Sequence, residues 1–240
     1  MLTEPKMQEF LSTMLKAYHA AHRPKIGNAN GKVIRGRAHC VAGVFEDAFA
    51  NLVCTEILWK KEANCLAFTD FPITVEPPLD CSKKKCETRY IDLMLCKLKE
   101  GSDCEILYMA ELKTNTGWIR GTVSDRVEDN SNLLRHLKKK STLISVRGDT
   151  LKEVCLPSKY SRYKFSLSPR CRYDLIILSG ANAGHSLKHY KKFQRAALAS
   201  LMILTDDCIS WRNTKGEVPS PRVDDYSLLD ERIRKCVGHK

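Results

Sequence analysis

Tyr90-Ile-Asp-Leu-Met-Leu-Cys-Lys-Leu98 is an apolar run of the length of a β-strand, and Leu107-Tyr-Met-Ala-Glu-Leu-Lys-Thr114 is a second. The segment between them, residues 99–103, is polar and contains a glycine, which suits a hairpin connection. We therefore expect two central strands that pair antiparallel.

Charged residues lie inside these two apolar strands. Side chains alternate across a strand, so Glu111 and Lys113 share one face while Leu112 lies on the other. If the strands pair antiparallel, Asp92 can join Glu111 and Lys113 on that face. A buried acid or lysine without a partner would cost several kcal/mol, so these groups need a partner or a metal ion. The alternative is a structural ion pair between Asp92 and Lys113.

Composition restricts the class of protein. The chain has 240 residues, of which 43% are hydrophobic, enough for one large domain or for a core domain with an added lobe. Its apolar runs are too short to span a bilayer, and no secretory hydrophobic region begins the sequence. We therefore expect a soluble, cytoplasmic protein. The eleven cysteines form no disulfide framework and are expected to be reduced thiols.

The net charge of +12 favours a polyanionic partner. Nucleic acid is favoured over a membrane surface, because no basic amphipathic segment has a tryptophan-rich apolar face. Two basic loops (residues 23–37 and 157–173) and the start of a basic helix supply candidate phosphate contacts, although solvated loops would have the same composition. The candidates are Lys32, Arg35, Arg37, Lys159, Arg162, Lys164, Arg170, Lys188 and Lys191.

Hydrophobic periodicity predicts the remaining elements. Helices are expected over residues 2–22, 38–58, 120–140 and 185–204, with a short one near 228–237, and strands over 142–146 and 174–178. Residues 59–79 are expected to be irregular, with at most a short strand at 73–75. Glu46 lies early in the second helix, where the helix dipole favours an acid whatever its function. Alternatively, Glu46 faces the sheet and joins the site.

The order of these elements and acids resembles the PD-(D/E)XK nuclease superfamily. Asp92 matches the first acid, Glu111 and Lys113 match the (D/E)-x-K element, and Glu46 matches the acid that many members have on the preceding helix. Residues 36–50 are similar to the acid-bearing helix of some type II restriction enzymes. The resemblance covers residues 36–204 and departs at Ile91, where the motif has proline.

The resemblance implies an α/β (α+β) fold with a restriction-endonuclease-like core, in which helices flank a central mixed β-sheet. It implies one nuclease domain over 1–240, with helix 2–22 and tail 206–240 as additions to the core. Mg²⁺ or Mn²⁺ would bind Asp92, Glu111 and the carbonyl of Leu112, because these are hard oxygen ligands. Lys113 would orient or deprotonate the attacking water, and Glu46 would hold a metal-bound water or a second ion.

His39 is a second candidate ligand, because some viral RNA endonucleases of this superfamily add a histidine that favours Mn²⁺. The resemblance implies a type II restriction endonuclease that cuts double-stranded DNA as a homodimer. The alternatives are a nonspecific, repair or RNA nuclease on the same fold, or a basic nucleic-acid-binding protein without catalysis.

Overall fold

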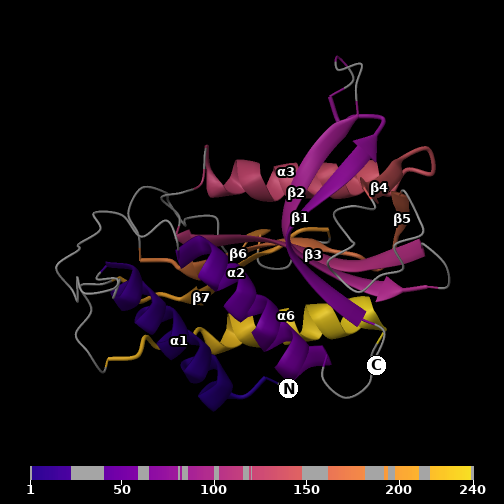
Figure 1. The fold of residues 1–240 in the computed structure, drawn as a ribbon. Helices are drawn as coiled ribbons and strands as arrows, with labels where there is room; N and C mark the ends of the chain where they lie inside the picture. Colours follow the sequence, from indigo (N-terminus) through magenta and orange to yellow (C-terminus); the bar gives the residue numbers. More distant parts are fainter. Residues whose placement is uncertain are drawn as a thin grey trace, which may run out of the picture.

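The computed structural model describes residues 2–22, 41–58, 65–80, 82, 86–99, 103–115, 119, 121–147, 162–181, 192–193, 198–210 and 217–238. These residues form a mixed α/β structure (Figure 1). In chain order the elements are α1 (Glu4–His22), α2 (Val41–Leu52), the π-helical turn η2 (Val53–Leu58), β1 (Cys65–Glu76), β2 (Glu87–Leu98), β3 (Asp103–Asn115), α3 (Val123–Leu137), β4 (Leu143–Arg147), β5 (Arg162–Leu167), β6 (Tyr173–Ser179), β7 (Leu201–Thr205) and α6 (Val223–Val237).

The strands form one mixed seven-stranded sheet in the order β2-β1-β4-β5-β3-β6-β7. β2 also pairs with β3, so the pairings of β1, β2, β3, β5 and β4 close into a ring. The β2–β3 pair is antiparallel, as the hairpin prediction requires. β6 and β7 continue from β3 as parallel strands, and all residues of both are buried. The prediction of a central mixed sheet flanked by helices is confirmed.

Helices cover both faces of this sheet. In Figure 1, α3 lies on one side, and α1, α2 and α6 lie on the other. The first half of α3 packs on β6 and β7 through Val123 and Val127, and its second half covers the closed part of the sheet through Leu133, Leu134 and Leu137. α1 and α6 contribute side chains to the same buried cluster as α2, so both terminal helices are part of the main core.

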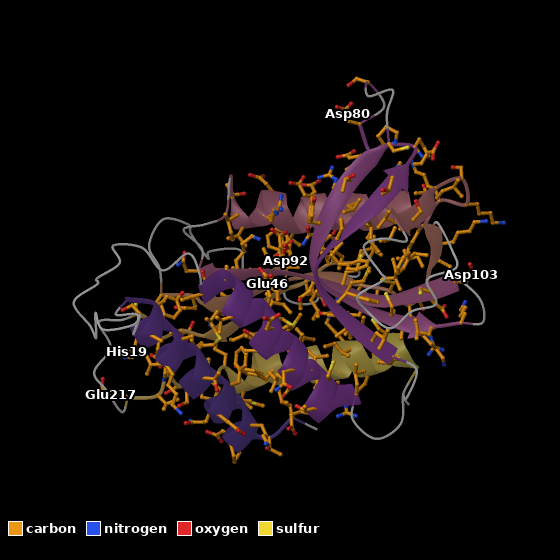
Figure 2. The ribbon with its side chains drawn as sticks, in the orientation of Figure 1. His19, Glu46, Asp80, Asp92, Asp103 and Glu217 are labelled. Carbon is orange, nitrogen blue, oxygen red and sulfur yellow. The ribbon has the colours of Figure 1, made fainter. Side chains whose placement is uncertain are left out.

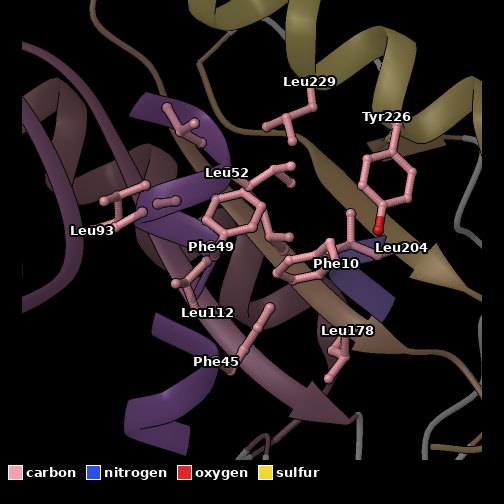
Figure 3. Packing of buried hydrophobic residues seen from close by; sticks show 14 of the residues in the cluster. Phe10, Phe45, Phe49, Leu52, Leu93, Leu112, Leu178, Leu204, Tyr226 and Leu229 are labelled. Atoms are coloured by element: carbon pink, nitrogen blue, oxygen red, sulfur yellow. The ribbon is translucent and has the colours of Figure 1, made fainter. Parts of the chain in front are cut away.

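An aromatic cluster fixes α1 and α2 to the sheet. The ring centroids of Phe45 and Phe49 are 5.9 Å apart, and each lies 6.2 Å from that of Phe10. Leu112 and Leu93 belong to the same core (Figure 3). Because Leu112 is held on this side, the alternation of β3 directs Glu111 and Lys113 to the opposite face.

Two predicted elements are wrong. β1 runs for 12 residues where an irregular segment was expected. In the sequence, Asp70 and Pro72 interrupt the pattern of a strand. In the structure, Asp70 has a φ of 44° within β1. Among the described residues, β4 pairs only with residues 74–76 of β1, so no described strand is paired with that edge of β1 at Pro72, where proline is tolerated.

The second correction concerns residues 201–204, which were expected to end a helix. They form β7, a parallel strand at the edge of the sheet beside β6. Every residue of β7 is buried and all but the last, Thr205, are apolar, so the sequence has neither helical nor strand periodicity. The other predicted helices and strands that fall within described residues are present. None of the described helices is long and apolar enough to cross a membrane.

Candidate active site

The candidate site lies where β2 separates from β3. Their ladder runs from the hairpin turn to the pair Leu93–Ala110, and the next β2 residue away from the turn, Asp92, no longer pairs with β3. Instead, its carboxylate Oδ2 accepts a hydrogen bond of 2.8 Å from the backbone N–H of Leu112. The side chain of Asp92 therefore takes the place of the next inter-strand backbone acceptor and is held against β3. We call this point, where β2 and β3 separate, the fork.

Three oxygens converge on the ammonium group of Lys113. Its Nζ lies 3.0 Å from Glu111 Oε1, 3.3 Å from Asp92 Oδ2 and 3.3 Å from the Leu112 carbonyl oxygen. These are the three groups that the sequence predicts as metal ligands. The structure therefore brings Asp92, Glu111, Leu112 and Lys113 together, and it places a cation at the point that their oxygens share.

Glu111 has a second cationic partner. The Nε of Arg126, from α3, lies 2.7 Å from both carboxylate oxygens. Glu111 is only 2% exposed, so a buried carboxylate is balanced by two cations. A capping box at Thr122 and Asp125 fixes the start of α3 and thereby places Arg126 within reach of β3.

The protonation states follow from burial and these contacts. Burial raises the pKa of Asp92 above its usual range, and the Lys113 ammonium and the Leu112 N–H partly oppose the rise. Burial alone would lower the pKa of Lys113, but the carboxylates of Asp92 and Glu111 outweigh it, so the pKa is raised. These contacts favour the ammonium form of Lys113, which donates hydrogen bonds to the surrounding oxygens. Burial also raises the pKa of the neighbouring Tyr173 far above its usual range, so this phenol stays protonated.

Glu46 approaches the site from α2. Figure 2 shows its side chain beside Asp92. Burial and then the negative charges of Asp92 and Asp70 raise the pKa of Glu46 to about 7. Glu46 is therefore about half protonated at neutral pH, and a divalent cation nearby would favour its ionised form.

The available ligands suit a hard divalent cation. Among the described residues, no group of three or more His, Cys, Asp and Glu side chains is arranged to hold a metal ion. A site made of two carboxylates and a backbone carbonyl does not need such a group, and Mg²⁺ keeps several of its waters. Because Asp92, Glu111 and the Leu112 carbonyl already surround one cation, the residues fit this ion. His39 lies outside the described residues.

No protein-family model, curated protein or solved structure matched the chain. The interpretation of this site therefore depends on its geometry and on the sequence motif.

Most of the predicted phosphate contacts lie outside the part of the chain that the structure describes. For Arg162 only the backbone is described, and six others lie outside the described residues: Lys32, Arg35, Arg37, Lys159, Lys188 and Lys191. Lys164 and Arg170 are exposed. Lys164 pairs with Asp103, eight residues before Glu111 on β3, which puts it about 25 Å from the site. Lys164 is therefore not brought to the candidate site, and Arg170 lies against the C-terminal part of α6, where its carbonyl accepts a hydrogen bond from Cys236 Sγ.

The sequence did not identify Arg126, Asp70 or Tyr173 as neighbours of the site. The Thr122-x-x-Asp125 capping box was a usable signal for the start of α3, and hence for the position of Arg126. Nothing local indicated that α3 would cross the end of β3.

The raised pKa of Glu46 predicts a pH-dependent stability. The unfolded carboxyl loses its proton near its ordinary value of 4.5, and the folded one near 7, so the folded state binds more protons between these values. The protonated carboxyl of Glu46 therefore stabilises the folded state at low pH, and this stabilisation is lost as the pH rises through about 7. Between pH 5 and 8 without metal, the wild type should lose about 1–2 kcal/mol relative to Glu46→Gln, since the side chain is partly solvated.

Urea unfolding in EDTA at several pH values measures this difference. Glu128→Gln, at an exposed position on α3, is the matched control and should follow the wild type. Equal pH dependence in the wild type and in Glu46→Gln would contradict the assignment.

Proposed function

We propose that this protein is a metal-dependent nuclease with a restriction-endonuclease-like core, of the PD-(D/E)XK superfamily, that hydrolyses DNA phosphodiester bonds. Its most specific form is a type II restriction endonuclease. Cutting both strands then requires two symmetry-related sites, so a homodimer is part of the proposal. The observation that supports it is the convergence of Asp92, Glu111 and the Leu112 carbonyl on one cationic position at the fork of β2 and β3.

The chemistry divides among the residues of the fork. A bound Mg²⁺ would supply Lewis-acid stabilisation of the charge that develops on the phosphate. Asp92 and Glu111 hold that position, and Asp92 is oriented by the Leu112 N–H. Lys113, displaced from the shared point, would donate hydrogen bonds to a phosphate oxygen or to the attacking water. Glu46 can accept a proton from that water near neutral pH.

The alternative without catalysis is a structural ion-pair cluster. The Asp92–Lys113 contact at 3.3 Å is what that alternative expects. However, the side chains of Lys113 and Asp92 are 23% and 21% exposed, so the pair is open to solvent. An ion pair that is open to solvent contributes little to stability, so a purely structural role explains this contact poorly. Three additional charged groups, those of Glu111, Arg126 and Glu46, lie at the same fork, which is more than a hairpin requires.

Incubation of supercoiled plasmid with the protein and Mg²⁺ or Mn²⁺ tests the proposal. We expect loss of the supercoiled form, blocked by EDTA. Discrete fragments would indicate sequence-specific cleavage, and a smear would indicate a nonspecific nuclease. Cleavage of RNA alone would support the same fold with another substrate. A gel shift without cleavage under either metal would contradict the enzymatic proposal and favour a binding protein.

A further inference from the structure

The charges at the fork are balanced without any metal ion. Asp92 and Glu111 contribute two negative charges, and Lys113 and Arg126 contribute two positive ones. A divalent cation added to these four groups would leave an excess of positive charge, which the carboxylate of Glu46 reduces but does not cancel. A phosphodiester is an anion that would offset part of this excess, so the metal and the substrate should favour each other's binding.

Arg126 is the residue best placed to connect the two events. Its Nε contacts both oxygens of Glu111, yet its side chain is 41% exposed. Within the described part of the chain, its Nη groups donate no hydrogen bond, and Nη1 is 3.8 Å from a largely exposed carboxylate, that of Asp129. The guanidinium therefore holds a buried acid through Nε, and among the described residues its Nη donors remain available for a further acceptor. Planar guanidinium donors match phosphate oxygens.

We propose that Arg126 couples metal binding to substrate binding: it neutralises Glu111 in the metal-free site, and it donates to a backbone phosphate of the nucleic acid once a divalent cation occupies the point that Lys113 holds. This inference rests on the proposed nuclease function. It makes Arg126 a competitor of the metal when no substrate is present, and a substrate ligand when the metal is bound.

Calorimetric titration of Mn²⁺ without nucleic acid tests the first half. Arg126→Gln removes one positive charge a few ångströms from the metal position, so Mn²⁺ should bind roughly tenfold more tightly than to the wild type. Arg126→Lys retains the charge and should bind Mn²⁺ within about threefold of the wild type. Tighter binding should also appear as a larger rise of the melting temperature with Mn²⁺ in Arg126→Gln.

The second half is tested by fluorescence anisotropy with a short labelled DNA duplex, in Ca²⁺ and in EDTA. The wild type should bind the duplex more tightly in Ca²⁺, and Arg126→Gln should lose most of this enhancement. If Arg126 has a purely structural role, Arg126→Gln should instead bind Mn²⁺ more weakly than the wild type, because Glu111 would lose its fixed position. The melting temperature of the variant would then fall as well.

The outcomes separate the two proposals. If the wild type cleaves plasmid DNA but Arg126→Gln binds Mn²⁺ no more tightly than the wild type, the role of Arg126 is overturned and the nuclease function is left intact. Failure of the wild type to bind Mn²⁺ and to cleave overturns both.

Discussion

Asp92→Asn should reduce the Mg²⁺-dependent cleavage rate on the order of 10³-fold while leaving the fold intact. Asparagine keeps a side-chain oxygen that can accept the hydrogen bond from the Leu112 N–H, so the fork between β2 and β3 is preserved. It removes the negative charge that faces the Lys113 position, and with it one of two carboxylates that would hold the metal. The measurement is the initial rate of plasmid cleavage, together with the melting temperature in EDTA.

The matched control is Asp103→Asn, the same change at the exposed start of β3. Figure 2 shows Asp103 far from Asp92. The control should cleave at the wild-type rate. Full activity in Asp92→Asn, with normal metal dependence, would remove Asp92 from the mechanism and return the Asp92–Lys113 contact to a structural role.

Arg232→Ala should lower the free energy of unfolding by about 3–5 kcal/mol. Asp174, at the start of β6, is fully buried, and Arg232 of α6 binds it through two donors at 2.7 and 2.8 Å. The hydroxyl of Tyr108 and the backbone N–H of Ser200 also donate to this carboxylate. Removal of the arginine leaves a buried negative charge with only neutral donors, and it releases α6 from the sheet.

Urea unfolding of Arg232→Ala and of Lys235→Ala measures this effect. Lys235 belongs to the same helix and pairs with the exposed Glu231, so its loss should cost at most about 1 kcal/mol. Similar losses for the two variants would contradict the structural role of the buried pair. Asp174 pairs with Ala110 and therefore lies on the face of the sheet opposite to Glu111, so loss of this pair should affect cleavage only through the folded fraction.

Local signals were sufficient for the centre of the fold. The charged residues within two apolar strands, the period-2 alternation and the short polar connection predicted the antiparallel β2–β3 pair. They also predicted that Asp92, Glu111 and Lys113 meet. These signals succeeded because strand pairing in a short hairpin depends on residues close together in the sequence.

Local signals failed where the environment, rather than the pattern, selects the structure. β1 contains Pro72 and the left-handed Asp70, and its strand conformation depends on pairing with β2 along most of its length. β7 is apolar at every position except Thr205, so periodicity does not mark it as a strand, and it is one because β6 provides a parallel partner for it. In both cases long-range pairing outweighs local propensity.

The sequence by itself determined the two central strands, the face that Asp92, Glu111 and Lys113 share, and the excess of positive charge. Only the tertiary structure decided that Arg126 reaches Glu111, that Glu46 lies beside Asp92, and that Arg232 clamps Asp174. The physical reason is that these contacts join side chains of helices and strands whose relative position depends on how α2, α3 and α6 pack on the sheet. That packing is set by the whole core, and no local pattern specifies it.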